Sequence, residues 1–263
     1  MSSARANVEP RVDPPVAKVD GQLVYAIGDI HGCYNLFRVL LAKIAADVVA
    51  TGRGRRPIII QLGDLIDRGP HSAQVVEAST WLQRRDDIEF QQLMGNHERA
   101  MLDFMDRPDA DGWLMFGGDA TMRSYGVEPP ALDAPAVKFT EARDAMLQRM
   151  PASHLHCIER AESMLTLGDY AFVHAGIRPG IALAEQDEDA LLWIGSEFTA
   201  SETRFEKVIV HGHTIEKDAR VLHNRIGIDT GAYRSEVLTA LRIEDGDVRL
   251  IQTGRARDHA TPL

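Results

Sequence analysis

Aspartate, asparagine and histidine residues recur beside glycines at five points along this chain. The sequences at these points are GDIHG from Gly28, GDLIDRG from Gly63, GNHE from Gly95, HAG from His174 and HGHT from His211. Carboxylate and amide oxygens, combined with imidazole nitrogens, form a mixed donor set that suits Mn, Fe or Zn better than Ca. A single motif of this kind is as consistent with an ordinary turn as with a metal site, but five in one chain predict a shared metal centre.

Each of the five motifs follows a short apolar run that predicts a buried strand. The runs cover residues 23–27, 58–62, 89–94, 170–173 and 208–210. The glycines let the backbone turn sharply where each strand ends. Because strand ends in an α/β sheet cluster in space and form ligand sites there, we expect the five motifs to meet.

Further helices and strands lie between and after these runs. Apolar residues at helical spacing predict helices over residues 36–44, 70–82 and 140–150, and a short acidic helix over 186–192. The strand-rich stretch 225–251 predicts a second sheet that faces the first. Residues 106–139 form an insertion with several prolines, and the sequence leaves open whether it is one wall of a substrate cleft or plain scaffold.

Length and composition indicate one large domain. A chain of 263 residues can bury a sizeable core, and we predict a flexible N-terminal tail over 1–20, a single domain over 21–253 and a C-terminal tail over 254–263. The net charge of −10 argues against a general nucleic-acid binder, which usually has a basic surface. We find no signal-peptide segment and no apolar run long enough to span a bilayer, so we expect a cytoplasmic protein without a membrane partner.

The five motifs, in this order, resemble those of the phosphoprotein phosphatase family of two-metal phosphoesterases. The similarity runs from about Tyr25 to about Tyr233, and the stretches HAGIRPG and RIGIDTGAY are most similar to its bacterial serine/threonine protein phosphatase branch. The resemblance implies a calcineurin-like metallophosphoesterase fold, with two facing mixed β-sheets flanked by helices. It also implies two divalent metal ions and, as substrate, a phosphoprotein or a small phosphomonoester.

The resemblance further implies which residues bind the two ions. The implied ligands, in chain order, are Asp29, His31, Asp64, Asn96, His174 and His213. Asp64 would bridge both ions, the two residues before it would bind the first ion, and the three residues after it would bind the second. Manganese is the expected metal, with iron or zinc as alternatives.

Three catalytic side chains are implied as well. His97 is adjacent to a ligand, where the family places a proton donor for the leaving-group oxygen, and Asp67 would hold that imidazole upright and charged. Arg68 would bind phosphate oxygens through its planar guanidinium. The alternative for Asp67 and Arg68 is an acid at a helix N-terminus with a surface salt bridge, and the surrounding motifs make this the weaker interpretation.

The chain departs from the family pattern at Gly195. Bacterial relatives often carry an arginine two residues after the tryptophan that matches Trp193, where it helps to hold phosphate. A glycine has no side chain for this role, so the second phosphate contact is in doubt. The remaining candidates for substrate contacts are Arg178, Arg204, Tyr233 and Arg234.

The sequence leaves three functions open. The first is a protein phosphatase that acts on phosphoserine, phosphothreonine or phosphotyrosine through a hydroxide bridging two ions. The second is a symmetrical bis(5'-nucleosyl)-tetraphosphatase, which the stretch Gly32-Cys33-Tyr34 resembles, although Asp67 and Glu98 are unusual in that group. The third is a metal-binding regulatory protein with weakened catalysis, and Gly195 is the only feature that supports it.

Overall fold

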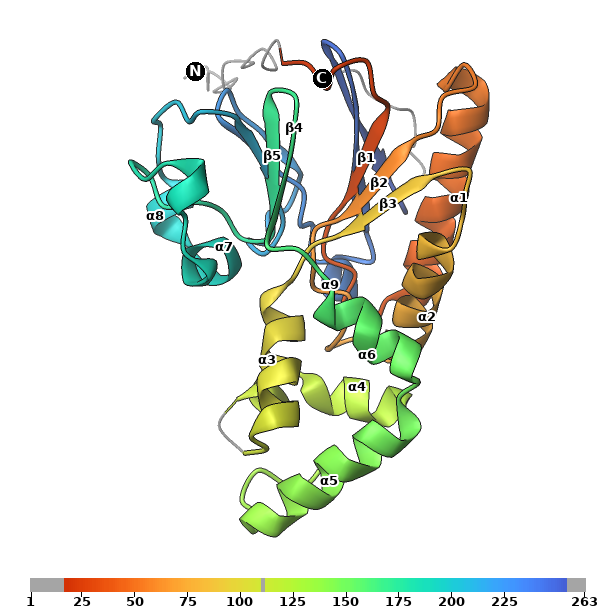
Figure 1. The fold of residues 1–263 in the computed structure, drawn as a ribbon, viewed down its shortest axis with the longest axis vertical. Coiled ribbons are helices and arrows are strands. Elements are labelled where there is room, and N and C mark those ends of the chain that lie inside the picture. Colours follow the sequence, from red (N-terminus) through yellow and green to blue (C-terminus); the bar gives the residue numbers. More distant parts are fainter. Residues whose placement is uncertain (1–16, 110–111, 255–263) are drawn as a thin grey trace, which may run out of the picture.

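Two five-stranded mixed sheets pack against each other in the computed structural model, which describes residues 17–109 and 112–254. Helices cover the outer face of each sheet (Figure 1). The predicted α/β class, with two facing mixed sheets flanked by helices, is therefore confirmed.

The first sheet has the strand order β10-β9-β1-β2-β3. Its strands are β1 (Val24–Ile27), β2 (Ile58–Gln61), β3 (Glu89–Gln92), β9 (Thr239–Glu244) and β10 (Asp247–Gln252). Strands β1, β2 and β3 are parallel, and β9 pairs antiparallel with both of its neighbours. The parallel strands thus carry the first three motifs to the same edge of the sheet.

The second sheet has the strand order β4-β5-β6-β8-β7. Its strands are β4 (Met164–Leu167), β5 (Tyr170–Val173), β6 (Val208–His211), β7 (Arg220–Val221) and β8 (Arg225–Gly227). The inner strands β5, β6 and β8 are parallel, and the edge strands β4 and β7 are antiparallel to them. The motifs that follow β5 and β6 therefore lie at one edge of this sheet.

Side chains alternate along each strand between the two faces of its sheet. In β1, Val24 and Ala26 contribute to the apolar layer between the sheets, while Tyr25 and Ile27 belong to the layer between the first sheet and its helices. Because both faces of the central strands are covered, these strands read as nearly continuous apolar runs in the sequence.

Helices α1 and α2 lie along the first sheet, α7 and α8 lie outside the second, and α3, α4 and α5 extend below both (Figure 1). The helices are α1 (Tyr34–Thr51), α2 (Ser72–Gln83), α3 (Asn96–Asp106), α4 (Gly118–Ser124), α5 (Ala136–Arg149), α6 (Ala152–Glu159), α7 (Glu188–Trp193), α8 (Ser196–Thr199) and α9 (Ala232–Ser235), with the 3-10 helices η1 (Trp113–Phe116) and η2 (Leu183–Glu185). Within the described ranges, none of them has both the length and the apolar character needed to cross a bilayer.

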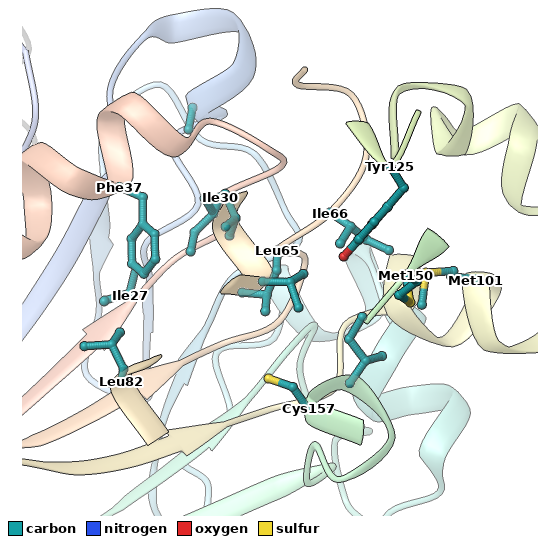
Figure 2. Close-up of a cluster of buried hydrophobic side chains, with 14 of the residues drawn as sticks. Ile27, Ile30, Phe37, Leu65, Ile66, Leu82, Met101, Tyr125, Met150 and Cys157 are labelled. Atoms are coloured by element: carbon teal, nitrogen blue, oxygen red, sulfur yellow. The ribbon is translucent and has the colours of Figure 1, made fainter. Parts of the chain in front are cut away.

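An apolar cluster between the first sheet and its helices anchors the motif loops. Figure 2 shows Ile30, Leu65 and Ile66 in succession across this cluster, with Ile30 beside Phe37 of α1. All three isoleucine and leucine side chains come from inside the first two motifs and are fully buried. The loops that carry the polar side chains are therefore held by apolar residues of the same loops, each worth roughly 1.5–3 kcal/mol when buried.

Residues 17–20 belong to the domain, although the sequence places them in a flexible tail. The sequence predicts a flexible tail as far as residue 20, but Ala17 and Val19 are buried. The backbone N–H groups of Lys18 and Val19 donate to the carboxylates of Asp169 and Asp245, at 2.9 and 2.7 Å. Residues 17–20 therefore pack against the domain, while the rest of the predicted tails, 1–16 and 255–263, lies outside the described residues.

The C-terminal strands correct another expectation. The sequence predicts that the stretch 225–251 builds the second sheet, but β9 and β10 extend the first sheet and only β8 joins the second. Periodicity identifies a strand without specifying its partner, which explains the error. The strands β4 and β7 and the helix α6 were not predicted.

Candidate active site

The five motifs meet where the strands of both sheets end. Asp64 lies at the centre, with its Oδ2 3.4 Å from Nε2 of His31 and its Oδ1 3.4 Å from Nε2 of His174. Among the described residues, two three-residue groups could hold a metal ion, and Asp64 belongs to both. The first group adds His31 and His97 to Asp64, and the second adds His174 and His213. A carboxylate shared by two ligand groups is the arrangement that a two-ion centre requires.

The imidazoles are oriented so that one nitrogen of each ring faces the centre. Nδ1 of His31 contacts the carbonyl of Ile66 at 2.9 Å, and Nδ1 of His174 contacts the carbonyl of Leu62 at 2.8 Å. In each ring the N–H is thereby assigned to Nδ1, which leaves the lone pair of Nε2 pointing at Asp64. Burial lowers the pKa of His31 to about 3 and that of His213 to about 4, so both rings are neutral at pH 7. Neutral, oriented imidazoles fit a divalent metal ion.

Asn96 and Asp29 complete the predicted ligand set in different ways. Oδ1 of Asn96 lies 2.8 Å from Nε2 of His174 and 3.1 Å from Nδ1 of His213, so these three donors converge on one point. Asp29 is in neither three-residue group. Its carboxylate accepts the backbone N–H of His213 at 3.1 and 3.2 Å, which ties the loop after β1 to the loop after β6.

Glycines allow the loops after β2 and β3 to touch. A Cβ atom at Gly95 would lie 2.3 Å from both the backbone nitrogen and Oδ1 of Asp64. A Cβ atom at Gly63, where φ is +97°, would lie 2.6 Å from the backbone of Gly95. The glycine in front of each polar residue is therefore needed because the two backbones pass in contact.

The backbone is strained at the centre of the site. Five of the eight described non-glycine residues with positive φ are predicted site residues: His31, Asp64, Asp67, Arg68 and His213. Each such conformation costs about 1–3 kcal/mol and persists only where the surroundings enforce it. The surrounding structure therefore stabilises unfavourable backbone conformations that orient these side chains, and such conformations are typical of functional sites.

Glu98 enforces part of this geometry. Its fully buried carboxylate accepts four backbone N–H groups, from Asp64, Leu65, Ile66 and Gly95, at 2.7–3.2 Å. Glu98 is the last residue of the GNHE motif, and the sequence alone does not indicate this structural role. In the structure, it fixes the loop after β2 to the start of α3.

His97 and Asp67 form a buried pair. Nδ1 of His97 lies 2.7 Å from Oδ2 of Asp67, and the Asp67 carboxylate also accepts the indole N–H of Trp113 at 2.9 Å and the hydroxyl of Thr121 at 2.6 Å. Burial lowers the pKa of His97, but the charges of Asp64 and Asp67 and the hydrogen bond to Asp67 outweigh it and raise the pKa above its usual value. These interactions favour the protonated form of His97 relative to an isolated imidazole. The insertion 106–139 supplies both Trp113 and Thr121, so it supports the site directly.

Arg68 is exposed and reaches over the centre. Its Nη1 and Nη2 lie 3.0 Å from Nε2 of His31 and of His97, respectively. Its guanidinium carbon lies 4.8 Å from the ring centroid of Tyr233, whose ring in turn contacts that of His31. The three predicted catalytic residues therefore lie together, and Tyr233 lies beside them.

The candidate arginines lie in different surroundings. Arg178 is paired with Asp187 and Glu197 at 3.6 and 3.5 Å, and no described contact joins it to the centre. Arg204 is exposed in the stretch between α8 and β6, again without a described contact to the centre. Arg234 lies 5.2 Å from the ring of Tyr233. Of the three, only Arg234 contacts a residue that itself borders the centre.

Asp229 also belongs to the site, although none of the five motifs includes it. It follows β8 and shares a hydrogen bond with Asp29, and burial and the charge of Asp64 raise its pKa to about 6. Burial, followed by the charges of Asp229 and Asp64, also raises the pKa of Asp29. Its sequence position resembles that of the five motifs, because Asp229 follows the apolar residues Ile226 and Ile228 and lies two residues before Gly231.

Comparison with known proteins defines the class. Residues 23–251 match the family model for calcineurin-like phosphoesterases, and the chain belongs to this family. The protein is a metallophosphoesterase, as the resemblance predicts, and the site described above contains the mixed nitrogen and oxygen donors that divalent ions require.

Its curated relatives carry two kinds of activity in their names. The asymmetrical bis(5'-nucleosyl)-tetraphosphatase PrpE of Anoxybacillus flavithermus is 28% identical over 237 residues, which cover 82% of this chain and 88% of the relative. Serine/threonine-protein phosphatase 2 of Escherichia coli is 28% identical over 233 residues, which cover 84% and 93%. A solved cold-active protein tyrosine phosphatase is 16% identical and has a TM-score of 0.60 over 91% of this chain and 79% of that one, which shows the same fold.

Proposed function

We propose that this chain is a metal-dependent phosphomonoesterase that removes phosphate from phosphorylated proteins. One observation carries the proposal: the His97–Asp67 pair, 2.7 Å apart and buried, directly beside the shared carboxylate Asp64. A phosphoprotein releases an alkoxide or a phenoxide, which leaves poorly until it receives a proton. A histidine whose pKa is raised by a buried carboxylate at that position is suited to supply this proton.

We assign the other steps of the reaction, which are metal binding, water activation and phosphate binding, to the two ligand groups and to Arg68. Divalent ions, for which manganese is our first choice, would activate a water for attack and neutralise phosphate charge. We assign Asp64 as the shared ligand, with Asp29 and His31 on one side. The ligands on the other side are Asn96, His174 and His213. Arg68, which is exposed above the centre, would bind the phosphate oxygens with its two terminal nitrogens.

A tetraphosphatase is the second candidate, because some relatives are named for that activity. Those named relatives cleave asymmetrically, so the alternative for this chain is asymmetrical cleavage and not the symmetrical cleavage considered from the sequence. The leaving group of such a reaction is itself a phosphate and leaves without an added proton. The buried proton donor therefore favours the phosphomonoester.

A side-by-side assay separates these functions. The manganese-loaded protein would be given phosphopeptides and diadenosine tetraphosphate at equal concentrations, and inorganic phosphate and nucleotides would be measured. We expect the higher kcat/KM on phosphopeptides. Release of ATP and AMP with little peptide turnover would assign the asymmetrical tetraphosphatase, and no turnover of either substrate by protein with two bound ions would assign a regulatory protein.

A further inference from the structure

Two large aromatic side chains are exposed beside the candidate active site. Phe116, at the end of η1, is 40% exposed, and Trp193, at the end of α7, is 38% exposed. Their rings contact each other with centroids 5.6 Å apart and planes inclined by 53°. Apolar side chains that are exposed next to each other form a patch, and such patches mark ligand-binding surfaces more often than single exposed residues do, so this pair beside the site points to a ligand.

The pair belongs to a continuous row of rings over the centre. The ring of Phe116 lies 6.1 Å from that of His97, and the ring of Trp193 lies 6.4 Å from that of His213, in both cases edge to face. The row therefore runs from the proposed proton donor through Phe116 and Trp193 to a proposed ligand of the second ion. An apolar wall stands directly beside the place where the leaving group would depart.

Both rings are held by the loops that build the site. Gly117, directly after Phe116, has a φ of +102°, and its carbonyl accepts the backbone N–H of Arg68 at 3.2 Å. On the other side, the carbonyl of Leu191 in α7 accepts the backbone N–H of Ala175, in the HAG loop, at 2.8 Å. The two rings are consequently placed relative to the same centre, although 77 residues separate them in the chain.

We propose that the adjoining rings of Phe116 and Trp193, here called the aromatic clamp, form one wall against which the aryl ring of phosphotyrosine packs, so that this chain prefers aryl over alkyl phosphomonoesters. This inference rests on the proposed phosphomonoesterase function and names its substrate class. Offset and tilted ring pairs with centroids 4.5–7 Å apart attract one another beyond simple burial, and the clamp offers such partners to an incoming ring.

The position of the clamp favours a tyrosine ring over a nucleobase. In phosphotyrosine the ring is bonded to the oxygen that His97 would protonate, and Phe116 is the ring next to His97. In a nucleotide the base is separated from the phosphate by a ribose. Gly195 keeps the approach beside Trp193 open, since a Cβ atom there would meet nothing within 4 Å. A flat aryl ring can therefore pack against Phe116 and Trp193 and has open space beside Gly195.

The test compares two peptides that differ only in carrying phosphotyrosine or phosphoserine at one position. The manganese-loaded variants are Phe116→Ala and Trp193→Ala, and the matched control is Trp81→Ala. Trp81 is a 51% exposed tryptophan of α2 that contacts Arg85 and lies outside the site. Circular dichroism and thermal melting would show that each variant is folded, which the exposure of these side chains leads us to expect.

We expect wild-type kcat/KM to be higher for the phosphotyrosine peptide. Each clamp variant should lower that value about tenfold, at the upper end of what one aromatic contact contributes, while changing the phosphoserine value less than about twofold. The control should change neither value. Equal losses on both peptides would mean a structural role and would overturn the proposal. A loss confined to diadenosine tetraphosphate would also overturn it, because the clamp would then hold a nucleobase.

Binding of non-hydrolysable phosphonates tests the clamp independently of catalysis. Phenylphosphonate and methylphosphonate differ by an aryl ring and are not hydrolysed, so their affinities for manganese-loaded protein can be measured without turnover. Tighter binding of phenylphosphonate than of methylphosphonate, with the difference lost in both clamp variants, supports the clamp even if neither peptide is hydrolysed. Equal affinities of the wild type for the two phosphonates would overturn the clamp. If both peptides were still hydrolysed in that case, the proposed phosphomonoesterase function would stand without the clamp.

Discussion

The floor of the candidate site and its rim are held in place by different means. We define the floor as Asp29, His31, Asp64, Asn96, His97, His174 and His213. We define the rim as Phe116, Trp193, Gly195 and Tyr233. Every floor residue except His213 is buried, whereas Phe116 and Trp193 are more than a third exposed. Hydrogen bonds to backbone carbonyls orient His31 and His174 of the floor, whereas Phe116 and Trp193 of the rim are held by a ring contact near the solvent.

This difference indicates a division of labour. Floor side chains bonded to backbone carbonyls and N–H groups have their geometry before any ligand arrives, which is what catalysis by positioned groups requires. Rim side chains contact one another weakly and can be exchanged without breaking those bonds. We infer that the floor determines whether phosphate is transferred and the rim determines from which substrate. The following predictions test that division, from the largest expected effect to the smallest.

Removal of metal ions should abolish turnover on every substrate, because the attacking group that we propose is a water activated by the two ions. Dialysis against a chelator followed by metal analysis checks this, and added Mn²⁺ should restore activity. Parallel additions of Fe²⁺ and Zn²⁺ would identify the preferred ion. Full activity in a preparation shown to contain no metal would contradict the two-ion mechanism.

Asp64→Asn should be the most damaging single change, since the two oxygens of this carboxylate face His31 and His174 separately. An amide replaces one of these oxygens with an NH₂ group and removes the shared negative charge. Metal content should fall and turnover should collapse. The control is Asp87→Asn, an exposed partner of Arg85 far from the floor, which should change neither quantity. Two bound ions with near-normal turnover in Asp64→Asn would mean that another group is shared.

His97→Ala should lower turnover of a phosphoserine peptide about 10²–10⁴-fold, the usual range for general acid catalysis. The expected loss is much smaller on 4-nitrophenyl phosphate, whose leaving group needs no proton. Steady-state kcat on the two substrates gives the comparison.

The conservative variant Asp67→Asn sharpens the same test. It keeps an oxygen near Trp113 and Thr121 but removes the charge that holds the proton on His97. It should therefore show the same dependence on the leaving group, with a smaller loss. If His97→Ala lowered kcat equally on both substrates, His97 would act in the metal site and not as the proton donor to the leaving group.

The floor could be predicted from the sequence because each of its residues lies shortly after the end of a strand that the sequence predicts. Parallel strands bring such positions together whatever the intervening helices do. Asp229 obeys the same rule after β8, so it could have been found in the same way. The sequence signal was local, and for the floor local information was sufficient.

The supports and the rim could not be predicted in this way. The contact of Trp113 with Asp67 joins residues 46 apart, and that of Phe116 with Trp193 joins residues 77 apart. The three aromatic residues Trp113, Phe116 and Trp193 lie at the ends of helices and not in strands. An aromatic residue at such a position is as consistent with core packing as with a functional site. Arg178 shows the converse, because the sequence placed it near phosphate while its partners are Asp187 and Glu197.

Glu98→Gln tests whether the floor depends on its backbone anchors. The amide of glutamine cannot accept all four N–H groups that Glu98 now accepts, and its NH₂ group would face N–H donors. Changes to such supporting groups usually lower metal affinity about 10–100-fold. Titration with Mn²⁺ would measure this, and Glu188→Gln on the exposed surface of α7 is a suitable control. Unchanged affinity would mean that the loop after β2 is held without Glu98.

Gly195→Arg tests the rim and should have the smallest effect, which is a gain. The backbone of Gly195 has a φ of −115°, outside the left-handed region, and a Cβ atom there would meet no atom within 4 Å. The added guanidinium could bind a phosphate oxygen beside the one held by Arg68. A hydrogen bond to a charged group is worth about 1.5–3 kcal/mol, so KM for a small aryl phosphate should fall about tenfold or more.

The variant Gly195→Gln adds a shorter polar side chain without the charge, so it should lack this gain if the attraction between the guanidinium and phosphate is the cause. No gain in a folded Gly195→Arg protein would mean that another cation already fills the role. Arg234 is then the residue to test, because it lies against Tyr233 at the border of the centre while Arg178 is occupied by two carboxylates. Arg234→Ala should raise KM if it is that cation. If both changes leave KM unaltered, Arg68 is the single arginine that binds phosphate, and the rim acts on the organic part of the substrate alone.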